Sequence, residues 1–187
     1  MKYSVFIATS ADGMIARKDG SVDWLHSAGN SKADMREHAD MGFKDFIASV
    51  DCMIMGRKCM EVVSKMNLTT EQWPYGSLHI IVLSNTLKYL PENMKNKVHL
   101  YSGNIIELVE RLSNEGFKHV YVDGGQTIQT FLTLKLINEI TITKAPILLG
   151  EGIPLFGNMD SEIRLSVLEN KTFPNDFLQV KYKVNYP

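Results

Sequence analysis

The chain has 187 residues, a formal net charge of −1 and a pI near 6.5. This balance offers no basic surface for nucleic acid or for an anionic membrane. No apolar run approaches the roughly 20 residues of a membrane-spanning helix, and the N-terminal run is too short for a signal peptide. Cys52 and Cys59 form no Cys-x-x-Cys motif, and the histidines lack metal-ligand spacing, so no disulfide and no metal site is expected. We predict a single domain over residues 1–187, located in the cytoplasm.

The first fifty residues are predicted to hold a strand, a long loop and a helix. Residues 3–9 form the strand, and the loop that follows contains Asp12. A long segment without a clear hydrophobic period often covers a site. Trp24 lies in this loop and suits a core position and a site position equally well. Ser31 and Asp34 resemble a capping box and predict the start of a helix.

The next strands are predicted at residues 52–55 and 78–83. The first of them is followed by Gly56, Arg57 and Lys58, which open a helical stretch. A glycine and two cations at a strand-to-helix junction suit a phosphate, because the N-terminus of a helix attracts anions. Two cations beside a turn are also common on ordinary protein surfaces. The junction is therefore a candidate anion site.

A second strand-to-helix junction lies within residues 119–132. Residues 119–122 read as a buried strand, Gly124 and Gly125 break it, and the residues from 126 onward have the periodicity of one helix face. Backbone N–H groups beside the positive end of a helix favour a phosphate or pyrophosphate. The junction lacks the third glycine of the Rossmann fingerprint and the Gly-Lys-Ser/Thr of a P-loop. A tight turn without a ligand is the alternative interpretation.

The C-terminal part is predicted to contain strands only. Residues 177–184 alternate apolar and polar side chains, which indicates an antiparallel strand with one wet face. Strands alternate with helices up to residue 136. This order predicts a three-layer α/β domain with a mostly parallel central sheet and an antiparallel C-terminal edge strand. Ligands of such sheets bind beyond the carboxyl ends of the strands, where both junctions lie.

Four short motifs appear in a familiar order. They are Ala8-Thr-Ser-Ala-Asp-Gly-Met-Ile-Ala16, Met55-Gly-Arg-Lys58, Val82-Leu-Ser84 and Asp123-Gly-Gly125. With these motifs the whole chain resembles the dihydrofolate-reductase-like superfamily. It is most similar to the branch that contains the reductase domain of the riboflavin-biosynthesis deaminase–reductase. The resemblance implies a dihydrofolate-reductase-like fold and a reductase that uses NADPH.

The resemblance also implies roles for individual residues. Ala8 and Ile15 match positions that hold the nicotinamide carboxamide. The cofactor phosphates and the adenosine end match Gly56, Arg57, Lys58, Ser84, Gly124, Gly125, Gln126 and Thr127. Asp12 and Trp24 fall in the loop that closes over the reacting centre. Cys59 departs from the superfamily, which often has threonine there.

Asp40 is the candidate proton donor. It lies sixteen residues before Gly56, on the predicted helix that also carries Phe43. A carboxylate at that spacing shares roughly the core-facing side, where loss of water would raise its pKa and suit it to proton transfer. A solvated helix carboxylate is the alternative, and Asp12 or a water beside it is another proton source.

Three functions compete at the level of sequence. The first is NADPH-dependent reduction of a heterocyclic or ribosylaminopyrimidine-like small molecule. The second is dihydrofolate reduction, and the third is NADPH binding without turnover. A scan of possible substrates would separate the first two functions. The third function predicts that NADPH binds and that no substrate oxidises it. A two-fold homodimer is the assembly expected most often for soluble chains, so we include it as a possibility.

Overall fold

The computed structural model describes residues 1–157 and 161–187. The fold is built around one eight-stranded sheet, in which the strand order is β5-β4-β3-β6-β1-β7-β10-β9. The strands are β1 (Lys2–Ser10), β3 (Cys52–Gly56), β4 (His79–Leu83), β5 (His99–Tyr101), β6 (His119–Asp123), β7 (Glu139–Ala145), β9 (Arg164–Thr172) and β10 (Leu178–Asn185). The short strands β2 (Met14–Ala16) and β8 (Ile153–Pro154) pair separately.

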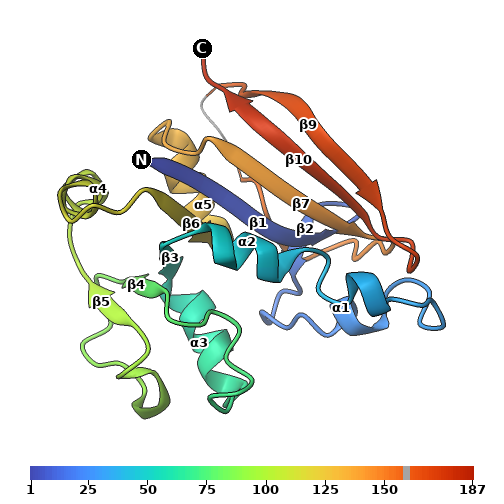
Figure 1. The fold of residues 1–187 in the computed structure, drawn as a ribbon, viewed down its shortest axis with the longest axis horizontal. Coiled ribbons are helices and arrows are strands. Elements are labelled where there is room, and N and C mark those ends of the chain that lie inside the picture. The colour runs from blue at the N-terminus through green and yellow to red at the C-terminus, as the bar shows by residue number, and fades with distance from the viewer. Residues whose placement is uncertain (158–160) are drawn as a thin grey trace.

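The sheet is parallel except at its C-terminal edge. β1 lies between β6 and β7 and is parallel to both, and β3, β4 and β5 continue the parallel part. β10 pairs antiparallel with β7 and with β9. Figure 1 shows β9 and β10 together at one side of the molecule. The predicted mostly parallel sheet with an antiparallel C-terminal edge is confirmed.

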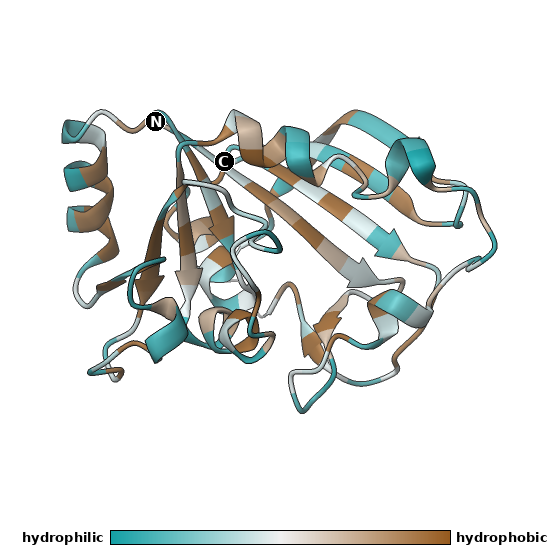
Figure 2. Ribbon diagram, turned by 60° about the horizontal axis from the view of Figure 1, so that its bottom comes forward, coloured by the Kyte–Doolittle hydropathy of each residue, from teal (hydrophilic) through white to brown (hydrophobic). Residues whose placement is uncertain are grey.

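Helices cover both faces of the parallel part and make three layers (Figure 1). On one face lie α2 (Phe43–Ser49) and α3 (Arg57–Lys65), which pack with Met53, Met55 and Tyr121 of the sheet. On the other face lie α4 (Ile105–Asn114) and α5 (Gly125–Thr133), which pack with Val120 and Val122. The apolar interior is visible as the brown strands and inner helix faces of Figure 2.

Local chemistry explains both limits of α4. The Asn104 side chain accepts a hydrogen bond from the N–H of Ile106 and begins α4, as the sequence predicts. Gly116 follows α4 with φ +93°, a left-handed conformation that favours glycine at this position after a helix. The remaining helical segments are short: α1 (Trp24–Ser27) and the 3-10 turns η1 (Arg36–His38) and η2 (Glu92–Met94).

The predicted start of α2, near Ser31, is wrong. α2 starts only at Phe43, because Met41 and Gly42 adopt φ +51° and +86°, which no right-handed helix can accommodate. The Asp34 carboxylate binds Arg36 and does not cap a helix. A capping-box spacing is therefore present here without the helix it usually opens.

Candidate functional site

A pocket of about 790 Å³ lies at the carboxyl end of the parallel strands. Segments far apart in the sequence form its walls: the ends of β1, β3, β4 and β6, the β1–β2 region and the first turns of α3 and α5. Its volume falls in the range typical of small-molecule sites. The structure brings together here all ten residues predicted to contact a cofactor: Ala8, Ile15, Gly56, Arg57, Lys58, Ser84, Gly124, Gly125, Gln126 and Thr127.

The N-termini of α3 and α5 meet in this pocket. A Cβ atom on Gly56 would lie 2.9 Å from Thr127 Oγ1, so the two first turns are in contact. A Cβ on Gly124 would lie 3.4 Å from Cys59 Sγ, and the φ of +91° at Gly124 further favours glycine. Two helix N-termini side by side direct backbone N–H groups and positive dipole ends toward one place.

Gly125 contacts the loop region after β1. It is helical, and the positive φ of this turn is at Gly124. A Cβ on Gly125 would lie 2.7 Å from Ile15 Cδ1 and 3.4 Å from the carbonyl oxygen of Pro154. A larger side chain at Gly125 would therefore displace Ile15, a predicted nicotinamide contact.

Two cations and the Ser84 hydroxyl are among the polar groups of the pocket wall. Arg57 Nη1 lies 2.8 Å from Glu61 Oε1 one helical turn later, so part of its charge is balanced within α3. Lys58 is exposed at the same wall. Ser84 Oγ accepts hydrogen bonds from the N–H groups of Thr86 and Leu87, which shapes the turn after β4. This wall suits an anion.

Asp12 lies beside the pocket and joins two loops. Its carboxylate accepts hydrogen bonds from Ser10 Oγ at 2.5 Å, from the N–H of Leu149 at 3.2 Å and from the N–H of Gly150 at 2.7 Å. These bonds lower the pKa of Asp12, the Ser10 hydroxyl most of all. Asp12 does not line the pocket. Its contacts tie the β1–β2 turn to the loop after β7.

Trp24 is a core residue in this structure. Its side chain is 0% exposed and packs with Ala145, Phe173 and Phe177. It is not part of the pocket wall, whereas its neighbours Val22 and Leu25 are. Of the two positions that the sequence allows for Trp24, the structure has the core position.

Of the two environments that the sequence leaves open for Asp40, the structure has the solvated one and not the cleft. Asp40 precedes α2, and its carboxylate accepts hydrogen bonds from the N–H of Lys44 at 2.9 Å and of Gly42 at 3.1 Å. These backbone bonds, the one from Lys44 above all, lower the pKa of an exposed carboxyl group. Asp40 caps the start of α2 and does not line the pocket. The spacing argument failed because it assumed a helix through Gly42.

Asp123 is the acidic residue that the site prediction missed. It ends β6, lines the pocket and accepts a hydrogen bond from Cys59 Sγ at 3.0 Å. Burial raises the pKa of Asp123, although hydrogen bonds from Cys59, the Gly124 backbone and Tyr121 oppose the rise. The available signal was its place immediately before the glycine pair, at the end of a buried strand.

Burial disfavours the thiolate form of Cys59, which lies beside Asp123. Burial raises the pKa of Cys59 well above its ordinary value, and the nearby Asp123 carboxylate adds to the rise. A protonated thiol donates a hydrogen bond but does not attack an electrophile. Cys59 therefore serves to hold the Asp123 carboxyl group in place.

Residues 1–157 and 161–187 contain neither a metal-binding cluster nor a membrane-spanning helix. No three His, Cys, Asp or Glu side chains gather there in an arrangement that would hold a metal ion. Within the same residues, no helix has the length and apolar character needed to cross a membrane.

Comparisons with known proteins agree with this architecture. The model of the RibD C-terminal domain family matches residues 2–179. YwjB of Bacillus subtilis (strain 168), an uncharacterized protein, is 31% identical over 174 residues, which is 92% of each chain. A crystal structure from Shewanella sp. PV-4, named as a candidate riboflavin biosynthesis protein, is 39% identical with a TM-score of 0.87 and covers 100% of both chains.

A more distant structure shares the fold. The diaminohydroxyphosphoribosylaminopyrimidine deaminase/5-amino-6-(5-phosphoribosylamino)uracil reductase of Thermotoga maritima has a TM-score of 0.70 at 11% identity. The match covers 97% of this chain and 56% of that one, so only part of the bifunctional enzyme corresponds to it. The fold, the motif order and the family match lead to one conclusion: this chain belongs to the RibD C-terminal domain family.

Proposed function

We propose that the chain is an NADPH-dependent reductase that transfers a hydride to a heterocyclic or ribosylaminopyrimidine-like small molecule. The observation that carries the proposal is the meeting of the α3 and α5 N-termini at Gly56 and Gly124 in a pocket beyond the parallel strands. Family membership and the reductase name of the Thermotoga relative support the same reaction class.

The residues present fit a dinucleotide. Gly56, Gly124 and Gly125 let the first turns of α3 and α5 and Ile15 pack closely, because a Cβ at these positions would meet Thr127, Cys59 or Ile15. This packing brings the two helix N-termini together at the pocket, where their N–H groups suit a pyrophosphate. Arg57 and Lys58 add positive charge at the same wall. Because a charge-assisted contact to phosphate contributes about 1.5–3 kcal/mol, the phosphate of NADPH would be favoured over the hydroxyl of NADH.

The chain has three tasks in this reaction. When bound, NADPH supplies the hydride. The α3 and α5 turns hold the cofactor phosphates, and Ala8 and Ile15 hold the nicotinamide end, as the family motifs imply. Asp123, which lines the same pocket, is the proposed proton donor, and burial would keep a proton on its carboxyl group at a higher pH than on a surface carboxyl. The hydride adds to carbon of a polar double bond and the proton to its heteroatom.

Calorimetric titration tests the cofactor assignment. Wild type should bind NADPH roughly ten- to hundred-fold more tightly than NADH. Gly125→Val should fold but bind NADPH much more weakly, because the side chain meets Ile15 and Pro154. Gly125→Ala should lie between the two, since it adds only the Cβ atom. Equal NADPH affinity in all three proteins would contradict the assignment.

A substrate screen tests turnover. Pterins, quinones and ribosylaminopyrimidines are mixed with the protein and NADPH, and the loss of nicotinamide absorbance is followed. The proposal predicts that a ribosylaminopyrimidine is reduced and dihydrofolate is not. Tight NADPH binding without oxidation by any of these compounds would instead favour a non-catalytic binding module.

A further inference from the structure

The strand order arranges the parts of the pocket in a line. In the sheet, β5 and β4 are followed by β3 and β6, and β1 comes next. The pocket wall therefore runs from the turn after β4, past the α3 and α5 N-termini, to the end of β1. Under the proposed function, Ala8 and Ile15 hold the nicotinamide at the β1 end. The compound that accepts the hydride lies there too, because hydride transfer requires contact with the nicotinamide.

We call this part of the wall, formed by β1, β2, α1, β8 and the loop before α1, the acceptor end. Eight described residues of these segments line it, and none of them has a charged or polar side chain. Three of the eight are alanine or glycine, and the other five are large and apolar: Ile7, Ile15, Val22, Leu25 and Ile153. An ion placed at the acceptor end would lose water without gaining a charged partner, which is unfavourable.

The positive charge of the pocket wall lies elsewhere. Among the described residues, Arg57 and Lys58 are the cations that line it, and both begin α3 after β3. β6 separates β3 from β1, so their backbone lies roughly 10 Å from β1 at a strand spacing of about 4.8 Å. This exceeds the Debye length of about 8 Å at physiological salt. The helix at the acceptor end, α1, has only four residues and lacks the dipole of a longer helix.

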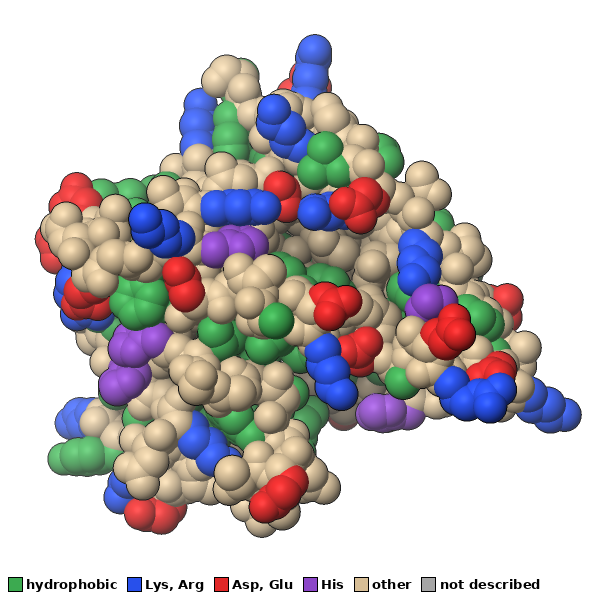
Figure 3. All heavy atoms as spheres, in the orientation of Figure 1, with side chains coloured by type: hydrophobic (Ala, Val, Ile, Leu, Met, Phe, Trp, Pro, Cys, Tyr) green, Lys and Arg blue, Asp and Glu red, His purple; other side chains and the backbone are tan. Residues whose placement is uncertain are grey.

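The segments around the acceptor end carry more negative than positive charge. Residues 11–23 and 146–152 contain four carboxylates and two cations. Both cations have partners, since Arg17 Nε lies 2.8 Å from Asp23 Oδ1 and Lys18 Nζ lies 2.5 Å from Glu151 Oε2. Figure 3 shows Lys, Arg, Asp and Glu side chains together at the right of the molecule, where α1 lies in Figure 1. The surplus of carboxylates repels an anion that approaches this end.

We propose that the acceptor end binds an uncharged ring compound without a phosphate group, and that this compound is the one reduced. The inference rests on the proposed function and narrows its substrate class. The reaction is unchanged: NADPH gives a hydride to a carbon of the acceptor, a proton goes to the heteroatom, and NADP⁺ remains. Recognition then depends on shape and on apolar contact with side chains such as Val22 and Leu25.

Calorimetric titration of two matched pairs of compounds tests the proposal. The first pair is 5-amino-6-(5-phosphoribosylamino)uracil and the same compound without its phosphate. The second pair is 1,4-naphthoquinone-2-sulfonate and 1,4-naphthoquinone. Each compound is titrated into the full chain saturated with NADP⁺, which has no hydride to give, so binding is measured without reaction. In each pair the uncharged member should bind at least about tenfold more tightly, because only the charged member loses the hydration of an ion.

Leu25→Arg tests whether the acceptor end sets this preference. The substitution places a cation at the apolar wall, so the affinity for the phosphorylated pyrimidine should rise at least about tenfold. Met66→Arg is the matched control, because Met66 is 51% exposed after α3 and outside the pocket wall. It adds the same charge and should keep the wild-type preference. If circular dichroism shows that Leu25→Arg does not fold, Val22→Arg replaces it, and the same rise is expected.

The outcomes separate this inference from the proposed function. A charged compound that binds wild type as tightly as its uncharged partner, in either pair, would overturn the inference. Failure of all four compounds to bind would overturn it as well, and so would an unchanged preference in the arginine variant of the acceptor end. NADPH oxidation by the same compounds is followed separately. Preferential binding of the uncharged compounds without any oxidation would refute the reductase and retain an uncharged ligand for the acceptor end.

Discussion

Asp123 is buried, accepts a hydrogen bond from the Cys59 thiol and lines the pocket. If it is the proton donor, Asp123→Asn should lower turnover at least tenfold, about 1.4 kcal/mol of transition-state stabilisation, with NADPH affinity kept. Wild-type turnover should fall as the pH rises through the pKa of Asp123. The Asn variant should lack this fall. Asp45→Asn, on the exposed side of α2, is the control and should behave as wild type.

The same substitution should stabilise the fold. Because the pKa of Asp123 is raised in the folded state, its ionised form is less favourable there than in the unfolded chain. The resulting penalty is absent below the unfolded pKa of 3.8 and complete above the folded pKa. At pH 8, Asp123→Asn should therefore have a higher Tm than wild type. A lower Tm would mean that its hydrogen bond from Cys59 outweighs the burial.

Arg57 should account for much of the cofactor preference. Arg57→Ala should lower NADPH affinity roughly ten-fold or more and leave NADH affinity nearly unchanged, because only NADPH carries the additional phosphate. Glu61→Gln is the informative partner variant, since it releases Arg57 from the 2.8 Å ion pair within α3. It should raise NADPH affinity. If Arg57→Ala keeps the preference for NADPH over NADH, the preference comes from Lys58 or from the Ser84 turn.

At the scale of elements, local sequence was informative where one interaction decides the structure. The apolar run 119–122, the glycine pair and the periodicity of residues 128–132 predicted β6, the turn and α5 in that order, because burial, glycine freedom and helix geometry agree there. The start of α2 was not predictable from spacing, because the spacing of Ser31 and Asp34 suits a turn as well as the start of a helix. The positive φ angles of Met41 and Gly42 set the start of α2. Such angles produce no periodic pattern in the sequence.

Some residues of the candidate site were also predictable from the sequence and others were not. The residues of the two strand-to-helix junctions were predictable from chain position, whereas Ala8, Ile15 and Ser84 were predicted from the family resemblance. Asp123, the proposed proton donor, was not predictable, because its raised pKa depends on its side-chain environment. Asp12, Asp40 and Asp123 are all aspartates near expected loops, yet hydrogen bonds lower the pKa of the first two and burial raises that of the third.

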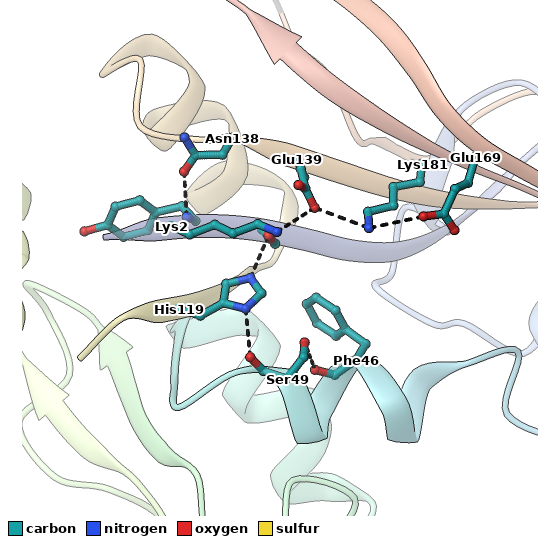
Figure 4. Close-up of polar contacts among 10 residues, drawn as sticks. Lys2, Phe46, Ser49, His119, Asn138, Glu139, Glu169 and Lys181 are labelled. Carbon is teal, nitrogen blue, oxygen red and sulfur yellow. Dashed lines mark hydrogen bonds and ion pairs between the residues drawn. The ribbon is translucent and has the colours of Figure 1, made fainter.

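His119 joins three elements and should make stability depend on pH. Its Nδ1 donates to the Ser49 carbonyl at the end of α2, which leaves Nε2 to accept from Ser4 Oγ of β1, both at 2.8 Å (Figure 4). Burial lowers the pKa of His119 below 6.5. The folded state thus binds fewer protons, so its contribution is full above pH 6.5 and is lost as the pH falls below that value.

Denaturant unfolding between pH 5 and 8 measures this contribution. The free energy of unfolding of wild type should decrease on acidification, and His119→Gln should show a smaller decrease. The pKa of His79 is also lowered by burial, so His79→Gln serves as the matched comparison and should remove a separate part of the slope. The interpretation fails if His119→Gln retains the full pH dependence of wild type.

For the molecule as a whole, the strand order places the C-terminal hairpin apart from the pocket. The pocket is assembled from residues 7–153, whereas β9 and β10 lie outside its wall. Substitutions in the exposed part of this hairpin should therefore leave cofactor binding unchanged. NADPH binding should raise the Tm of the whole chain, because ligand bound only by the folded state stabilises it by mass action.

The position of β1 has a consequence for synthesis on the ribosome. β1 is made first, yet its two neighbours in the sheet are β6 and β7, so Ser4 pairs with Tyr121 and with Glu139. More than half of the chain must be synthesised before the strands that cover the apolar residues of β1 exist. Pairing over such long separations is slow.

An arrested nascent chain that exposes only residues 1–118 should therefore be cut readily by protease and should not retain NADPH. A chain released at full length should become resistant once β7 and β10 have paired. Protease resistance already present in the 1–118 chain would show that β1 finds cover from β3 and β4 before its native neighbours are made.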